Sequence, residues 1–274
     1  MTGNSLFDLP GLEDLGDLHG AKVLVRADLN TPLGRDQQGA RVVADDFRIQ
    51  AVLPTLRYLV DAGAEVTCCS HLGRPKGSPD PDLTMEPVRE RLGELVPGVG
   101  LLENLRFHAE ESANDPAFVK QLVNGFDAYV NDAFGVCHRA HASVVGVPAR
   151  LPSAAGRRLA LEVRTLGALL EQPARPFVSI IGGAKVHDKV GVIRSLASKV
   201  DQLLVGGGMA FTFLVAMGHE VGDSLVDEES IETCRQLLDS FSNIVIPDDF
   251  LAMSTAEAFG SPEGGNGLST ERAR

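Results

Sequence analysis

Short runs of Val, Ile and Leu alternate along this chain with longer stretches whose apolar residues recur at helical spacing. Residues 45–62, for example, place Ile49, Val52 and Leu56 on one side of a helix. Strands that alternate with helices are typical of parallel sheets, because parallel strands need a crossover connection between them. The pattern therefore predicts an α/β fold with parallel sheets.

The same alternation gives the ranges of the individual elements. We predict strands at 21–26, 65–69, 100–102, 128–130, 177–181, 202–205 and 243–246. We predict helices at 45–62, with a kink at Pro54, and at 86–96, 116–124, 159–170, 189–199 and 228–241.

A pause in the alternation at 171–176, which contains Pro173 and Pro176, predicts a domain boundary. We place an N-terminal domain with its connecting helix at 1–171 and a partial C-terminal domain at 172–274. From Ser254 onward the sequence is rich in Ala, Gly, Ser and Glu without periodicity, which predicts loop or disorder. We therefore expect two Rossmann-like three-layer domains with parallel sheets, the second of them incomplete.

The predicted strands of the first domain run into polar and basic sequences. Because ligands of an open parallel sheet bind at the carboxyl ends of its strands, these sequences predict one site for a small, strongly anionic ligand. A solvated basic turn is the alternative for each segment taken alone. The residues concerned are Asp28, Leu29, Asn30, His71, Leu72, Gly73, Arg74, Arg106, His138 and Arg139.

The composition is acidic, with 25 Lys and Arg against 37 Asp and Glu and a formal net charge of −12. Such an average field excludes general binding to nucleic acid or to anionic membranes, so an anion would need a local cationic pocket. No apolar run approaches the length of a membrane span, and residues 1–17 lack the design of a secretory signal. We expect a soluble cytoplasmic protein with no nucleic-acid or membrane partner.

The four cysteines, Cys68, Cys69, Cys137 and Cys234, show no metal-binding spacing, and we expect them to be buried and reduced. His138 and His141 are three residues apart, but two imidazoles alone make a weak zinc site. We therefore predict no metal site, and expect these histidines to form local hydrogen bonds.

Two glycine-rich junctions follow the first two strands of the second domain. Gly183, Ala184 and Lys185 follow strand 177–181, and Gly207 and Gly208 follow strand 202–205. Glycines at the start of a helix accommodate phosphate oxygens, and Lys185 and Lys189 would share one face if both were helical. Neither GxxxxGK[ST] nor GxGxxG is present, so a role in tight turns alone stays the alternative. A phosphate site beside an anion site favours a kinase.

Seven motifs resemble those of the phosphoglycerate kinase family, in the family's order, and cover roughly residues 20–250. They are VRADLN (25–30), SHLGRP (70–75), LENLRFH (102–108), NDAFG (131–135), HRAH (138–141), GGAKV (182–186) and GGGMAFTF (206–213).

The resemblance implies a glycolytic kinase that transfers a phosphoryl group in line, across an interdomain cleft, between 1,3-bisphosphoglycerate with ADP and 3-phosphoglycerate with ATP. It assigns the phosphoglycerate to the strand-end residues and to Arg48, and the nucleotide to Gly183, Ala184, Lys185, Lys189, Gly207 and Gly208. Arg48, Lys189 and Lys185 would be catalytic. The nucleotide would carry Mg²⁺, and the protein would be a monomer.

The chain also departs from the family pattern. Family members are well over a hundred residues longer, so the resemblance implies a C-terminally truncated chain with little activity alone. A non-catalytic triose-phosphate-binding module derived from the kinase is the alternative. Arg157 and Arg158 stand where the family has apolar residues.

Overall fold

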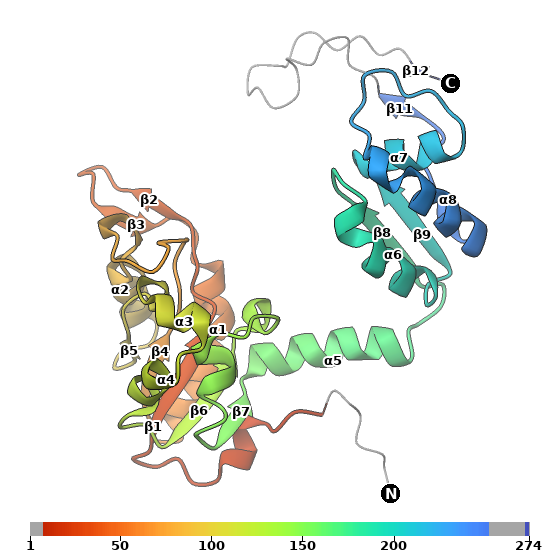
Figure 1. Cartoon of the computed structure of the whole chain (residues 1–274). Helices are drawn as coiled ribbons and strands as arrows, with labels where there is room; N and C mark the ends of the chain where they lie inside the picture. The colour runs from red at the N-terminus through yellow and green to blue at the C-terminus, as the bar shows by residue number, and fades with distance from the viewer. Residues whose placement is uncertain (1–7, 252–271, 274) are drawn as a thin grey trace, which may run out of the picture. The chain divides into compact units, whose positions relative to one another are not determined.

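The computed structural model describes residues 8–251 and 272–273. The chain divides into two compact units, Met1–Ala168 (unit 1) and Leu169–Arg274 (unit 2), which we describe separately (Figure 1). The boundary that we placed after Glu171 stays a prediction.

Unit 1 is built on a five-stranded sheet whose strands are all parallel, in the order β5-β4-β1-β6-β7. The four strands predicted for the first domain are confirmed, whereas the short edge strand β7 was not predicted. The strands are β1 (Lys22–Ala27), β4 (Glu65–Cys69), β5 (Gly100–Leu101), β6 (Ala128–Asp132) and β7 (Ser153–Ala155).

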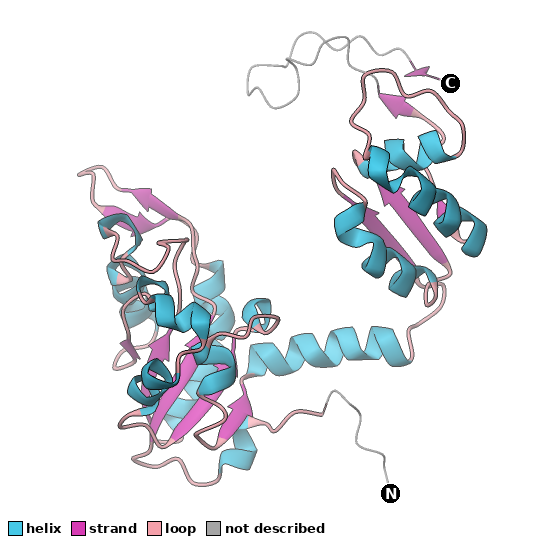
Figure 2. Ribbon diagram, in the orientation of Figure 1, coloured by secondary structure: helices cyan, strands magenta, loops and turns pink. Residues whose placement is uncertain are grey.

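Helices cover both faces of this sheet, because its strands present apolar side chains to each face (Figure 2). On one face, Val23 and Val25 of β1 pack in the same cluster as Ile49 and Leu56 of α1. On the other face, Leu24 of β1 packs in the apolar cluster that includes buried residues of α4. The helices are α1 (Phe47–Asp61), which continues through Pro54, α2 (Glu86–Leu95), α3 (Ala109–Ala113), α4 (Pro116–Val123) and α5 (Arg157–Glu171).

Several shorter elements of both units were not predicted, because they carry no periodic signal. An antiparallel hairpin joins β2 (Leu33–Arg35) to β3 (Arg41–Val43). The 3₁₀ turns are Leu12–Leu15, Pro81–Leu83, Leu105–Phe107, Phe134–Val136, His187–Lys189 and Glu228–Ser230, and Ala142–Gly146 form a π-helical turn.

The start of α5 depends on Asp132, at the end of β6. Its Oδ1 accepts the backbone NH groups of Arg158 at 2.8 Å and Leu159 at 3.0 Å, two of the donors that a helix start leaves unpaired. Arg157 lies over the Tyr58 ring and pairs with Glu13, and Arg158 pairs with Glu162 at 2.5 Å. At these two positions, where the family has apolar residues, the chain therefore makes ion pairs and a cation–π contact instead.

Unit 2 contains a three-stranded parallel sheet, in the order β10-β9-β8, which confirms the three predicted strands. The strands are β8 (Val178–Gly182), β9 (Gln202–Gly206) and β10 (Ile244–Val245). Leu203 packs on one face with Ile193, Phe213 and Leu237 from three helices, whereas Ile180 is 77% exposed. The helices are α6 (Val190–Ala197), α7 (Met209–Ala216) and α8 (Ile231–Ser240).

The sequence did not predict α7, because the helix is apolar on every side and has no polar face to set a period. The prediction of a loop from Ser254 lies mostly outside the described residues. At Arg272–Ala273 it is wrong, because this strand (β12) pairs antiparallel with β11 (Phe250–Leu251).

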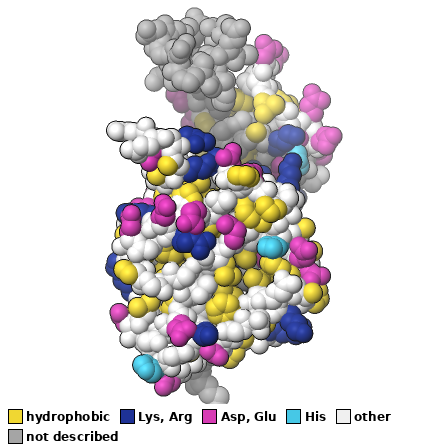
Figure 3. Space-filling view, turned by 90° about the vertical axis from the view of Figure 1, so that its left-hand side faces the viewer, with side chains coloured by type: hydrophobic (Ala, Val, Ile, Leu, Met, Phe, Trp, Pro, Cys, Tyr) yellow, Lys and Arg dark blue, Asp and Glu magenta, His cyan; other side chains and the backbone are white. Residues whose placement is uncertain are grey.

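Of the cysteines, Cys68 and Cys69 are buried on opposite faces of β4 and Cys234 is buried, as predicted, but Cys137 is exposed. No described helix has both the length and the apolar character needed to cross a membrane. Over the face shown in Figure 3, acidic side chains lie among the basic ones.

Candidate functional site

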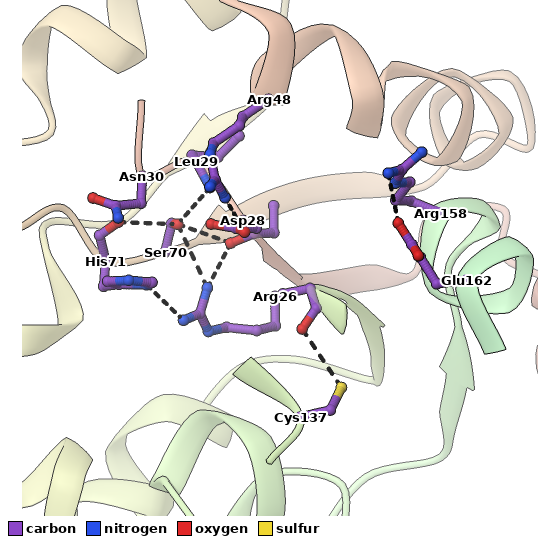
Figure 4. Close-up of polar contacts among 12 residues, drawn as sticks. Arg26, Asp28, Leu29, Asn30, Arg48, Ser70, His71, Cys137, Arg158 and Glu162 are labelled. Atoms are coloured by element: carbon purple, nitrogen blue, oxygen red, sulfur yellow. Dashed lines mark hydrogen bonds and ion pairs between the residues drawn. The ribbon is translucent and has the colours of Figure 1, made fainter. Parts of the chain in front are cut away.

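In unit 1, many of the residues that we predict to bind an anion follow the carboxyl ends of β1, β4 and β6. The register places Arg26 of β1 beside Cys69, the last residue of β4, and beside Asn131 of β6. The segments that follow these strands therefore start from one edge of the sheet, and Figure 4 shows the polar contacts among them.

Arg26 lies at the centre of these contacts, although only 1% of it is exposed. Its Nε donates to the Ser143 hydroxyl at 3.0 Å, and its Nη1 donates to both the Ala27 carbonyl and the Ser70 hydroxyl. One nitrogen also donates to His71 Nδ1 at 3.1 Å. Arg26 therefore joins β1 to the segment after β4.

His71 is a neutral hydrogen-bonding group in this setting. Burial, and then the positive charges of Arg26 and Arg106, lower the pKa of His71 to about 3. Because Nδ1 accepts from Arg26, the ring proton resides on Nε2. His71 can thus offer an N–H donor to an anion at neutral pH.

Asp28 and Asn30 follow β1 and contact other predicted site residues. Asp28 Oδ2 pairs with Arg48 of α1, and Asn30 Oδ1 accepts the Gly73 backbone NH at 2.8 Å. Gly73 has a φ of +61°, which favours glycine. The loop that carries Leu72 and Gly73 is therefore fixed against the end of β1.

Arg106 is positioned by Asn104, a fully buried amide. Asn104 Oδ1 accepts the backbone NH groups of Leu72 at 3.2 Å and Arg106 at 3.1 Å, and its Nδ2 donates to the Leu72 carbonyl at 2.8 Å. The Arg106 guanidinium donates to the Gly73 carbonyl at 2.9 Å. Asn104 thus ties the arginine to the loop after β4.

Several cations share this region. Burial, followed by the charges of Arg139, Arg26 and Arg74, lowers the pKa of Arg106. Arg74, His138 and Arg139 are exposed, so their side chains are accessible to a ligand. Such a concentration of positive charge around a neutral imidazole donor suits a small anion with more than one negative charge.

His141 differs from the exposed His138. It is buried, and its Nδ1 lies 3.7 Å from Oε1 of the buried Glu111. Burial lowers the pKa of His141, and the charge of Glu111 opposes that effect. Among the described residues, no three His, Cys, Asp or Glu side chains are grouped so that they could hold a metal ion.

The sequence missed the buried residues that support these groups. Arg26, Ser70 and Asn104 lie inside recognised motifs but were not assigned a role, whereas Glu111 and Ser143 gave no signal. Ser70 accepts the Leu29 NH at 2.9 Å and donates to the Ala27 carbonyl at 2.8 Å. A buried polar network of this kind depends on contacts between distant residues, which a single sequence does not reveal.

In unit 2, the predicted glycine junctions lie side by side at the ends of β8 and β9. The Met209 NH donates to the Gly183 carbonyl at 2.7 Å. A Cβ atom on Gly207, whose φ is +67°, would lie 3.1 Å from the Gly183 nitrogen. The two backbones therefore approach as closely as they do because neither residue has a side chain.

The two lysines do not meet the condition for a shared helix face, because Lys185 is not helical. Lys185 lies in the loop after β8, and Lys189 ends a 3₁₀ turn before α6, so they do not share a helix face. A Cβ on Gly183 would lie 3.0 Å from Lys189 Nζ, which places this ammonium group at the glycine junction.

Asp227 fixes the loop between these lysines. Its Oδ2 accepts the NH groups of Val186 at 3.0 Å and His187 at 3.2 Å, the His187 ring at 3.0 Å and the Ser230 hydroxyl at 3.0 Å. Burial would raise the pKa of Asp227, but these hydrogen bonds lower it to about 2. Asp227 also borders a hollow of about 320 Å³ together with Ala184, Lys185, His187 and Leu225.

Comparison with known proteins identifies the family of this chain. The family model described as "Phosphoglycerate kinase" matches residues 12–100 and 97–266. The chain belongs to the phosphoglycerate kinase family. This confirms the family identified from the motifs, and with it a transferase of the kinase class that acts in glycolysis.

The relatives named phosphoglycerate kinase include those of Salinispora arenicola (strain CNS-205) and Salinispora tropica, each 52% identical to this chain. The matches cover 90% and 94% of this chain, and 68% and 70% of the relatives. The solved phosphoglycerate kinase of Coxiella burnetii matches with a TM-score of 0.79 and 33% identity, over 88% of this chain and 67% of that one. That of Pyrococcus horikoshii OT3 gives a TM-score of 0.75 at 30% identity. These relatives do not favour the non-catalytic alternative.

Proposed function

We propose that unit 1 binds 3-phosphoglycerate or 1,3-bisphosphoglycerate, that unit 2 binds ADP or ATP, and that the chain transfers a phosphoryl group between them. The observation that carries this proposal is the set of cations around His71 at the carboxyl ends of the strands of unit 1. A ligand with a phosphate and a carboxylate would compensate charges that have few anionic partners in the protein itself.

We assign the phosphate of the ligand to Arg74, Arg106, Arg139 and the Nε2–H group of His71. Arginine pairs with phosphate through two parallel hydrogen bonds, and a neutral imidazole adds a donor without further charge repulsion. Arg48, which is about half exposed beside Asp28, is assigned to the reacting carboxylate. Asp28, the exposed His138 and the backbone of Leu29, Asn30, Leu72 and Gly73 complete the proposed site.

The chemistry needs no general base. The nucleophile in the ATP-consuming direction is a carboxylate, which is ionised far below neutral pH. Catalysis then consists of aligning the two substrates and neutralising charge on the migrating phosphoryl group. We propose that Arg48 does this from the phosphoglycerate side and Lys189, helped by Lys185, from the nucleotide side.

For the nucleotide, we propose that its phosphates lie against Gly183, Ala184, Gly207 and Gly208. The hollow beside Ala184 and Lys185 would accommodate another part of the same ligand. Mg²⁺ would arrive with the nucleotide, because this ion is usually held by substrate phosphates and waters with only one or two carboxylates. We further propose a monomeric cytoplasmic protein that binds neither membranes nor nucleic acid.

Calorimetric titration with 3-phosphoglycerate tests the proposal. Arg139→Ala should weaken binding at least tenfold, because it removes a charge-assisted partner of the phosphate. Arg150→Ala removes an equally exposed arginine just after the π-helical turn and should leave the affinity unchanged. Equal affinities for the wild type and Arg139→Ala would disprove the assigned site. The expected low activity of this chain alone stays a prediction, which a coupled assay of ATP formation checks.

A further inference from the structure

Glu111, on the short helix α3, is a buried carboxylate next to the basic groups of unit 1. Both of its oxygens are bonded to one residue. Oε1 accepts the Ser143 hydroxyl at 2.6 Å, and Oε2 accepts the Ser143 backbone NH at 3.0 Å. A carboxylate that is 1% exposed is costly to bury unless it is well bonded, and the reaction described above makes no use of it.

Ser143 connects this carboxylate with Arg26. The same hydroxyl that donates to Glu111 accepts from Arg26 Nε at 3.0 Å, so its hydrogen-bonding direction is fixed. The Ser143 carbonyl also accepts the Tyr129 hydroxyl at 2.5 Å. Arg26 in turn donates to His71 Nδ1 at 3.1 Å. Three successive contacts therefore lead from Glu111 to His71.

We propose that Glu111 is a positioning residue for the phosphoglycerate site, and that it acts through Ser143 and Arg26 on the His71 imidazole. With Arg26 held in place, His71 Nδ1 stays an acceptor and the proton remains on Nε2, where it can be donated to an anion. The identity of that anion rests on the proposed function. The contacts that orient His71 are independent of that function.

The charge of Glu111 and its position act on an anion in opposite directions. A negative charge near the site repels the ligand, whereas the fixed orientation of Arg26 and His71 favours binding. Ser143→Ala separates the two effects, because it removes the hydroxyl that connects Glu111 to Arg26 and keeps the charges of both residues. We expect this variant to bind 3-phosphoglycerate about tenfold more weakly.

Glu111→Gln should also weaken binding, and the double variant should bind no more weakly than Ser143→Ala alone, because the carboxylate acts through the serine. Glu110→Gln, an exposed change on the same helix, is the matched control and should bind as the wild type does. Tighter binding by Glu111→Gln would overturn the proposal, because the carboxylate would then only oppose the ligand.

The ¹⁵N NMR shifts of His71 in the ligand-free protein give a readout that a general loss of stability would not move. The wild type should show a protonated Nε2 and an unprotonated Nδ1, and Ser143→Ala should show a mixture of tautomers. Unchanged shifts in that variant overturn the proposal whatever its affinity. If the wild type does not bind 3-phosphoglycerate, the proposed function fails, while these shifts still decide the role of Glu111.

Tyr129→Phe serves as a second variant in case both buried substitutions prevent folding. It removes the hydroxyl that anchors the Ser143 carbonyl, and so loosens Ser143 without changing the side chains of Glu111, Ser143 or Arg26. We expect a smaller change of the His71 shifts in the same direction. Shifts identical to the wild type would count against the proposal.

Discussion

Arg48 and Asp28, two residues that we assign to the same ligand, form an ion pair with each other at the carboxyl end of β1. Arg48 comes from the first turn of α1, and Asp28 follows directly after the strand. Only Oδ2 of Asp28 takes part in the pair, and Oδ1 is buried with no hydrogen-bond partner among the described residues. An unpaired buried oxygen of this kind is suited to accept a hydrogen bond from a hydroxyl group of a ligand.

Asp28→Ala should therefore remove the selectivity for the 2-hydroxyl group of 3-phosphoglycerate. The wild type should bind the analogue without this hydroxyl about tenfold more weakly than 3-phosphoglycerate, since a hydrogen bond to a charged group is lost. The variant should bind both ligands with equal affinity. Calorimetric titration of both proteins with both ligands checks this, and an undiminished preference in the variant would contradict it.

The low pKa of His71 makes unit 1 sensitive to acid. The unfolded chain protonates this histidine below about pH 6.5, whereas the folded protein does so only near pH 3. The unfolded state thus binds the extra proton, and the free energy of unfolding should fall by up to about 1.4 kcal/mol per pH unit as the pH drops through this window. Urea denaturation followed by circular dichroism should show that His71→Gln loses less stability than the wild type between about pH 7 and about pH 5. His138→Gln, at an exposed histidine, should behave as the wild type does.

Gly207→Ala should disrupt the junction at the ends of β8 and β9. Its Cβ would lie 3.1 Å and 3.2 Å from the Gly183 nitrogen and oxygen, at a backbone conformation that disfavours alanine. We expect a loss of about 1–3 kcal/mol in the stability of unit 2 and loss of nucleotide binding. Gly191→Ala, inside α6 with nothing within 4 Å of the new atom, should be neutral or stabilising. Thermal unfolding and ATP titration of both variants would distinguish them, and a stable, ATP-binding Gly207→Ala protein would contradict the assignment.

Asp227→Asn should loosen the loop that carries Lys185 and Lys189. An amide keeps the size of the side chain, but it lacks the negative charge that strengthens the hydrogen bonds which Oδ2 accepts from Val186, His187 and Ser230. We expect weaker ATP binding and a destabilisation of about 1–3 kcal/mol. Asp239→Asn, at an exposed position of α8, is the control. If the two variants bind ATP equally, Asp227 does not position the loop.

The carboxylate of Asp227 also contributes to stability in a particular pH range. Its pKa of about 2 lies below the value of an unfolded aspartate, so this contribution is complete above about pH 4 and is lost as the pH falls toward 2. The wild type should therefore lose more stability than Asp227→Asn when denaturation is measured over that range.

The strand ends were predictable from the sequence because a parallel sheet brings the carboxyl ends of its strands to one edge. The positions of Arg106 and His71 followed from that rule and from their place in the chain. The sequence did not show that Lys185 lies outside the helix, because spacing alone does not fix where a helix begins. In the structure, Asp227 holds the loop that precedes α6, and the helix begins only at Val190.

Other features lie beyond single-sequence reasoning for the same physical reason. The role of Glu111 depends on Ser143, 32 residues away, and that of Asn104 depends on Leu72, also 32 residues away. Asp227 did leave a signal, since an aspartate directly before a predicted helix is typical of a helix start. Contacts to a distant loop, such as the one Asp227 makes with Val186, leave no such pattern.

The gathering of Arg26, Arg74, Arg106 and Arg139 has a practical consequence for work on this protein. Their mutual repulsion is present in the folded chain before any substrate arrives, and after burial it is the next cause of the lowered pKa of Arg106. Any multivalent anion that enters the site relieves this repulsion and binds the folded state in preference to the unfolded one. We therefore expect sulfate and phosphate buffers to compete for the proposed site of unit 1, so that they raise its melting temperature and mask its affinity for substrate.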